Sequence, residues 1–275
     1  MRRLRPAGFT LIELVMTIVI SAIIGLISMR FVSTYVQGWV DTSARVTLSG
    51  TAWVASEQLV RQIREALPHS VRSFTDGGNA CLELVPVIAA ADYLSLPKGN
   101  KSTSIEVVEV SGVSVGTSAW ISVYPNSENS VYGNSGPGNS ISTAAATLGA
   151  VNNHVQTLTF PTAQSFPNNS PVRRLFLISQ PIAYCEDGSG RLWRYANYGF
   201  AKDSTGLLPA SDAVLMLDNI LPGSLRFGLA AAQLQRNSIV HVEFRTLRAA
   251  RDGNQTGSTG EQLQINREVQ LINVP

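Results

Sequence analysis

The sequence predicts an α+β protein, in which one long N-terminal helix is followed by an antiparallel, β-rich globular domain. No proline occurs between Pro6 and Pro68, and apolar residues recur at steps of seven along this stretch. After Leu67 the pattern changes to short apolar runs with period two, separated by turn-forming residues. We therefore expect a helix over residues 9–67 and a β-rich domain over residues 68–275.

The helix begins with an apolar run of transmembrane length. The run spans Phe9 to Met29, and about 20 apolar residues are enough to cross a bilayer. A secretory signal peptide has a shorter apolar core and a small-residue cleavage site after it, whereas ISMRFVS follows here. We expect a basic leader over residues 1–8, a membrane helix over 9–29 and a helical stem over 30–67. Three basic residues orient the leader toward the cytoplasm by the positive-inside rule: Arg2, Arg3 and Arg5.

One acidic residue, Glu13, interrupts the apolar run. A carboxylate inside hydrocarbon costs several kcal/mol on most estimates, so intramembrane acids are functional candidates by default. An ordinary signal anchor accounts for the basic residues and the apolar run but not for Glu13. The acid lies in the short sequence GFTLIEL, which begins at Gly8.

GFTLIEL resembles the processing motif of type IV prepilins and pseudopilins. The resemblance implies that a membrane-embedded prepilin peptidase cuts after Gly8, that Phe9 is then N-methylated, and that Glu13 is the fifth residue of the mature chain. Cleavage creates a cationic amine on Phe9, and an unpaired buried charge is expensive whereas a paired one is tolerable. Glu13 is expected to pair with the Phe9 amine of a neighbouring subunit or of its own chain, which sets the register between subunits. Gly8 suits the cut because it has no side chain to block the protease.

The predicted stem carries one apolar row along its length. We expect its second half to pack on the protein's own sheet, as in pilins, because only this row is consistently apolar and Gly38 and Gly50 interrupt it. A plain coiled-coil seam is the alternative. The row consists of Val32, Trp39, Val46, Trp53, Val60 and Leu67.

The globular part contains ten candidate strands and several turns. The sequence PIAYCEDGSGRLWRYANY predicts a β-hairpin about its Gly-rich turn, and QRNS at 235–238 predicts a second hairpin turn. Two segments rich in small polar residues, 126–149 and 251–260, are predicted to be surface loops. The candidate strands are 81–88, 104–110, 119–124, 155–160, 174–185, 191–198, 213–217, 225–234, 239–247 and 262–272.

Shorter stretches of the globular part narrow the resemblance. ALPHSVR, CLELVPV, PIAYC, GRLWRY and INREVQLINVP are similar to minor pilins of mannose-sensitive haemagglutinin (MSHA) pili, of the MshO, PilW and GspJ type. Without its eight-residue leader the 275-residue chain has 267 residues, which exceeds a typical major pilin and favours a minor subunit. The implied partners are the prepilin peptidase, other major and minor pilins contacted through the N-terminal helix, the inner-membrane assembly platform and membrane lipid. The implied location is the inner membrane of a Gram-negative bacterium, with the C-terminal domain in the periplasm, and then the fibre.

The two cysteines, Cys81 and Cys185, form no CxxC motif and no Cys/His cluster, so no zinc site is predicted. An exported domain folds in the oxidising periplasm, where the pair can bridge. Such a bridge closes a loop of about 100 residues, worth at most ~4–5 kcal/mol in the chain-entropy model. Two buried free thiols are the alternative.

No residue pattern predicts catalysis, a metal or a cofactor. Residues 112–116, GVSVG, match the nucleophile elbow G-x-S-x-G, but that motif needs a following helix and TSAWISVYP predicts a strand. Two turn sequences, at 187–190 and 252–254, lack the spacing of a calcium loop. Without the leader the chain has 18 basic and 19 acidic residues, so the charge footprint of a nucleic-acid binder is missing.

Three alternatives stay open at this point. Within the family, the alternative is a pseudopilin of a type II secretion system. From another class, the alternative is a signal-anchored periplasmic enzyme or binding protein whose N-terminus is never cut. Adhesion or DNA capture through exposed sheet edges or the 126–149 segment is a third, although that segment has Tyr132 and no Lys or Arg.

Overall fold

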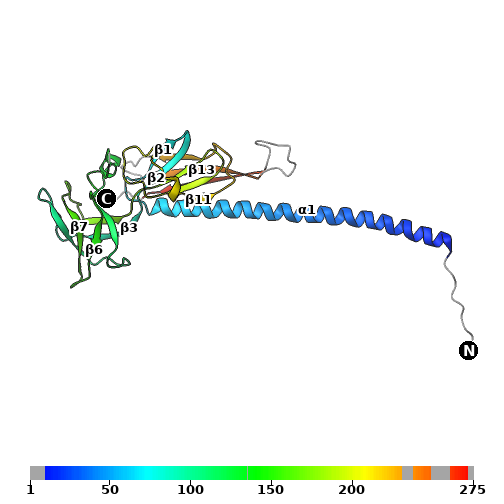
Figure 1. Ribbon diagram of the computed structural model, residues 1–275, viewed down its shortest axis with the longest axis horizontal. Helices are drawn as coiled ribbons and strands as arrows, with labels where there is room; N and C mark the ends of the chain where they lie inside the picture. Colours follow the sequence, from blue (N-terminus) through cyan, green and yellow to red (C-terminus); the bar gives the residue numbers. More distant parts are fainter. Residues whose placement is uncertain (1–9, 135, 231–237, 249–260, 272–275) are drawn as a thin grey trace, which may run out of the picture. The chain divides into compact units, whose positions relative to one another are not determined.

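The computed structural model describes residues 10–134, 136–230, 238–248 and 261–271. The chain divides into two compact units, residues 1–50 and 51–275. Helix α1, Leu11–Arg64, forms the described part of the first unit and continues into the second, where strands follow it (Figure 1). The α+β fold class, with an apolar N-terminal helix followed by antiparallel sheets, is confirmed and fits the type IV pilin fold.

The last three turns of α1 pack into the globular unit through a face of small side chains and leucine-sized ones. Ala52, Ala55 and Ser56 are buried at one end of this face, and Leu59 and Ile63 at the other. Small residues let the helix backbone approach the sheets closely, and the larger ones fill the core behind them.

The predicted seven-step row is therefore wrong as the packing face. Val32, Trp39, Val46 and Trp53 are all more than half exposed, and in this row only Val60 and Leu67 are buried. Val32, Trp39 and Val46 belong to the first unit, residues 1–50, whereas the buried residues of the helix begin at Ala52. At the level of Trp53 the buried face consists of Ala52, Ala55 and Ser56 instead.

The helix ends at Arg64, three residues before the predicted end. Ala66 already forms a β-bridge with Pro86, and the Leu67 N–H donates to the Val85 carbonyl at 2.8 Å. These pairings satisfy backbone groups that a helix end would otherwise leave without partners.

Two antiparallel sheets enclose the end of α1. The order in the first is β1-β2-β9-β10-β11 and in the second β12-β13-β14. Their apolar side chains and the buried face of α1 form one core, which includes Leu82, Tyr184, Val242 and Phe244. The β9–β10 pair confirms the hairpin predicted about the Gly-rich turn. The strands are β1 (Arg72–Asp76), β2 (Asn79–Leu84), β9 (Ile182–Glu186), β10 (Leu192–Tyr195), β11 (Val214–Leu217), β12 (Arg226–Ala230), β13 (Ile239–Arg248) and β14 (Glu261–Gln270).

The part of the chain between β2 and β9 forms a third sheet, which is a lobe with its own core. Its order is β3-β8-β5-β6-β7-β4, and its two outer strands meet through a bridge between Tyr93 and Val107, which closes it into a barrel (Figure 1). Buried side chains such as Ile121, Leu158 and Leu177 fill its interior. The strands are β3 (Val87–Asp92), β4 (Ser102–Val108), β5 (Ser118–Val123), β6 (Ala146–Leu148), β7 (Val155–Gln164) and β8 (Arg174–Ile178).

Prolines mark both passages between this barrel lobe and the sheet around α1. The predicted strand 81–88 is interrupted at Pro86, and the predicted strand 174–185 is interrupted just before β9, at Pro181. Proline has no N–H to donate to a ladder, so strands usually break there. The two passages lie side by side, since the Ser179 N–H donates to the Pro86 carbonyl at 3.1 Å.

The segment 126–149 is more ordered than the surface loop that its composition predicts. It contains helix α2 (Glu128–Val131), capped by Ser127 and Ser130, and strand β6. Tyr132 and Ile141 are buried between the barrel lobe and the rest of the domain. Its serines bond the backbone instead of water, and Gly138 lies so close to the Ser130 carbonyl that a Cβ would overlap it. The small polar residues of this segment therefore provide the backbone hydrogen bonds and the close approach that its compact conformation requires.

Two short elements were not predicted, and two predicted segments lie largely outside the described residues. Strand β1 was not predicted, because the period-two pattern of RSFTD is short. The turn predicted at 235–238 and the loop predicted at 251–260 lie largely outside the described residues. A short 3₁₀ helix, η1 (Ala210–Asp212), precedes β11.

Cys81 and Cys185 form a disulfide across the neighbouring strands β2 and β9. The two cysteines are directly opposite in the strand register and are almost fully buried. Because these strands lead into and out of the barrel lobe, the bond fixes the base of that lobe.

A buried ion pair joins the first sheet to the loop that follows β10. Arg72 on β1 pairs with Glu83 directly opposite on β2, and their side chains are 9% and 0% exposed. The guanidinium also donates to the carbonyls of Ala201 and Lys202 at 2.8 and 2.7 Å. Burial alone would lower the pKa of Arg72, but the Glu83 carboxylate raises it on balance.

The Arg72–Glu83 pair makes further contacts beyond the first sheet. Arg72 lies 3.7 Å from the centre of the Tyr132 ring and 3.3 Å from the Glu128 carboxylate of α2. Glu83 accepts hydrogen bonds from Tyr198 and Ser204, both at 2.8 Å. Burial and the Glu83 charge raise the pKa of Tyr198 well above its ordinary value, so the tyrosine stays a donor.

Replacing Arg72 by Met should lower the free energy of unfolding by about 3–5 kcal/mol, because it leaves Glu83 buried without its counterion. The measurement is denaturant unfolding of the detergent-solubilised protein, followed by tryptophan fluorescence. The exposed pair Glu109–His154 provides a control, and Glu109→Gln should change stability by less than about 1 kcal/mol. Equal stability of Arg72→Met and the unsubstituted protein would contradict this account.

Candidate processing and assembly site

The first turn of α1 is capped by Thr10. The backbone N–H of Glu13 donates to Thr10 Oγ1 at 3.3 Å, and the helix begins at Leu11. Thr10 and Glu13 have the spacing of a capping box, S/T-x-x-E, in which the first residue accepts a bond from the third helical residue. The sequence pattern T-L-I-E carries the local signal of this cap.

Glu13 lies in this first turn with its side chain exposed. A carboxylate near a helix N-terminus interacts favourably with the helix dipole, which offsets part of its cost in an apolar surrounding. The carboxylate is therefore accessible to a cationic group from outside the helix. The predicted cleavage and methylation residues, Gly8 and Phe9, and the leader arginines Arg2, Arg3 and Arg5 lie outside the described residues.

The apolar run of α1 is suited to a membrane. An 18-residue window reaches a mean hydropathy of 2.5, and none of it is buried within the protein. Leu11, Ile12 and Met29 are 83%, 66% and 74% exposed. An apolar helix surface of this kind needs either hydrocarbon or other apolar helices around it.

A cation clamp fixes the stem to the last strand. Arg267 on β14 lies 4.0 Å from the centre of the Trp53 ring and donates to Glu57 at 2.7 Å. Trp53, Ser56 and Glu57 share one side of α1, and Arg267 contacts all three. This contact ties the C-terminal strand to the helix, and residues from Thr51 onward belong to the globular unit.

The catalytic motif at 112–116 lacks the structure of a nucleophile elbow. Gly112 and Gly116 have positive φ angles in turns, and strand β5 follows instead of a helix. The motif joins β4 to β5, which are not paired with each other, so it is not a hairpin turn either. Within the described ranges no group of three His, Cys, Asp or Glu side chains could hold a metal.

Both carboxylate oxygens of Asp187, in the turn at 187–190, accept hydrogen bonds from residues of the same hairpin. Asp187 Oδ1 accepts the backbone N–H groups of Ser189 and Arg191, at 2.8 and 3.2 Å. Its Oδ2 accepts from Arg191 Nε and Trp193 Nε1, at 2.8 and 3.0 Å. Burial alone would raise the pKa of Asp187, but these hydrogen bonds lower it on balance. The turn sequence at 252–254 lies outside the described residues.

The prokaryotic N-terminal methylation motif matches residues 3–29. No curated protein and no solved structure matches the chain. The matched segment contains Gly8, Phe9 and Glu13 and coincides with the apolar run at the start of α1. This match, the single apolar N-terminal helix and the α+β fold support a type IV pilin-like protein, either pilin or pseudopilin, that is anchored in a membrane. The motif implies processing by a prepilin peptidase and assembly with other pilins.

Replacing Asp187 by Asn should destabilise the protein at pH 7 by about 1 kcal/mol, because the ionised carboxylate accepts four hydrogen bonds. A carboxyl whose pKa is lowered on folding stabilises above its unfolded pKa, and that stability is lost as the pH falls through the folded pKa. The difference between the two proteins should therefore shrink below about pH 4. Thermal unfolding across pH measures it, with Asp92→Asn on the exposed side of β3 as control. A difference independent of pH would contradict this assignment.

Proposed function

We propose that this protein is a minor type IV pilin of the MSHA type, which takes part in pilus assembly at the fibre tip or in a priming complex. The observation that carries the proposal is the N-terminal methylation motif at the start of a helix whose N-terminal apolar run is not buried by any described part of the protein. The short similarities to MSHA minor pilins of the MshO type support the finer assignment, and the extra barrel lobe supports a low-copy subunit over a shaft subunit.

In this proposal Glu13 sets the offset between neighbouring subunits. The Glu13 carboxylate is exposed, and in the sequence Glu13 is the fifth residue counted from Phe9, on which cleavage would create an amine. Because both charges enter an apolar helix bundle on assembly, only an offset that pairs them avoids a large desolvation cost. Because this cost is avoided only when Glu13 pairs with the neighbouring subunit's amine, the pairing fixes the register between subunits.

The proposed topology follows from the leader. Three arginines before residue 8 keep the N-terminus cytoplasmic and place the globular unit in the periplasm. The disulfide between Cys81 and Cys185 supports an oxidising compartment. The proposed partners are the prepilin peptidase, other major and minor pilins, the inner-membrane assembly platform and lipid. No catalytic activity of its own and no nucleic-acid binding are proposed.

A type II secretion pseudopilin shares every N-terminal feature, so a processing assay cannot separate the two functions. Deletion of the gene can: loss of surface pili with normal enzyme secretion favours the pilin, and the opposite result favours the pseudopilin.

Mass spectrometry of the N-terminal peptide tests the proposal. We expect a peptide that begins at N-methylated Phe9, recovered from sheared fibres. The same peptide found only in membranes would support a priming role. An intact N-terminus in both fractions would overturn the proposal in favour of a signal-anchored periplasmic enzyme or binding protein.

Glu13→Val should still insert into the membrane but should enter fibres poorly, because the Phe9 amine then has no partner. We expect at least a tenfold lower ratio of fibre to membrane protein, measured by immunoblotting of sheared fibres. Met16→Val, one apolar residue for another in the same run, should assemble normally. Normal incorporation of Glu13→Val would refute the role given to this carboxylate.

A further inference from the structure

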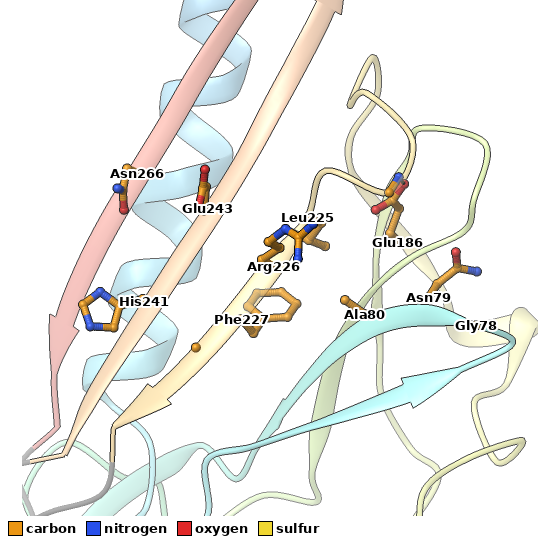
Figure 2. Close-up of a pocket in the computed structure, with 12 residues that line it drawn as sticks. Gly78, Asn79, Ala80, Glu186, Leu225, Arg226, Phe227, His241, Glu243 and Asn266 are labelled. Atoms are coloured by element: carbon orange, nitrogen blue, oxygen red, sulfur yellow. Dashed lines mark hydrogen bonds between the residues drawn. The ribbon is translucent and has the colours of Figure 1, made fainter.

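An open groove lies between strand β12 and the turn that joins β1 to β2 (Figure 2). Its volume is about 660 Å³, which lies within the usual size range of ligand sites. Leu225 and Phe227 line one side, and Gly78 and Ala80 line the other. Because the residues on the second side are small, the groove stays open beside the strand. A Cβ added at Gly78 would meet no atom within 4 Å.

Strand β12 borders the groove with an unpaired edge. It pairs with β13 on one side and is the last strand of its sheet on the other. Among the described residues, no other backbone or side-chain group bonds the backbone of residues 226–230. A row of free N–H and C=O groups beside a groove is the arrangement that accepts an added strand from another chain.

A buried carboxylate faces the same groove. Glu186 at the end of β9 is only 4% exposed and lines the groove. Its Oε1 accepts the Gly223 N–H at 2.7 Å, while its Oε2 has no hydrogen-bond partner among the described residues. This oxygen is not fully buried, so it is available to a donor that enters the groove.

No described basic side chain forms an ion pair with Glu186. Arg226 also lines the groove and forms no ion pair with any described acid, although Glu243 is its direct cross-strand neighbour. Glu243 accepts a hydrogen bond from Gln264 at 2.9 Å, and His241 lies 3.9 Å from Glu268. The two carboxylates that line the groove, Glu186 and Glu243, can therefore both accept a cationic group.

We propose that this groove binds an extended segment of a partner protein, which adds to the free edge of β12 and places a lysine or arginine side chain against Glu186. Main-chain hydrogen bonds to β12 supply affinity that does not depend on sequence, and the charge-assisted bond to Glu186 supplies selectivity. Leu225 and Phe227 contact the apolar side chains beside the basic one. The inference stands on the globular unit alone and does not depend on the proposed function.

Capped pentapeptides test the proposal on the full-length protein in detergent micelles. One pool has a central lysine with random flanks of Val, Thr, Ile and Ser, and two matched pools have central norleucine or glutamate. The immobilised protein is incubated with each pool, and retained peptides are counted by mass spectrometry. We expect the lysine pool to be retained about tenfold more than the norleucine pool, in line with a charge-assisted bond.

Two variants assign the retention to the groove. Glu186→Gln keeps an oxygen for the Gly223 N–H and should fold, as near-ultraviolet circular dichroism will show, but should reduce lysine retention to the norleucine level. Ala80→Leu should lower retention of both pools by filling the groove, and Glu268→Gln on the neighbouring sheet face should change neither. Equal retention of the three pools, preference for glutamate, or no effect of Glu186→Gln would overturn the proposal.

Discussion

The contact on which the globular unit depends is the packing of a narrow helix face against two sheets at once. Ala52, Ala55 and Ser56 allow the backbone of α1 close to the sheets, and Leu59 and Ile63 fill the space between β2, β9, β13 and β14. Neither sheet buries both of its faces by itself, so the helix is what makes them one core. Arg267 reinforces the contact from the last strand, through Trp53 and Glu57.

The same helix satisfies two different surroundings along its length. From Leu11 to Met29 its surface is apolar and exposed, and from Ala52 onward one side is buried in the protein's own core. The buried residues of the helix begin at Ala52, so its earlier apolar residues do not belong to the protein's own core. The two ends therefore use different residues, and Glu13 is the only charged side chain in the apolar part.

The barrel lobe depends on polar contacts at its base as much as on its own core. Its chain enters and leaves through neighbouring strands that the Cys81–Cys185 bond joins. Beside that bond, Arg72 and Glu83 bind the lobe through Glu128 and Tyr132. A buried ion pair adds little net stability but strongly penalises arrangements that break it, so it favours one orientation of the lobe. The groove lies beside the unpaired edge of β12, and its lining includes Ala80 of β2.

Local sequence by itself determined the α+β class, the apolar helix, the processing motif and the change of pattern near Leu67, because each depends on neighbouring residues. It also located most strands, since alternation is a local signal. The tertiary structure decided which strands pair, because paired strands such as β2 and β9 are about 100 residues apart in the chain. Thus the barrel, the disulfide, the order of 126–149 and the true packing face of α1 came from contacts between distant segments. The carboxylates show the same division: Glu13 stands out within an apolar run, whereas Glu83 and Glu186 acquire their importance only when folding buries them.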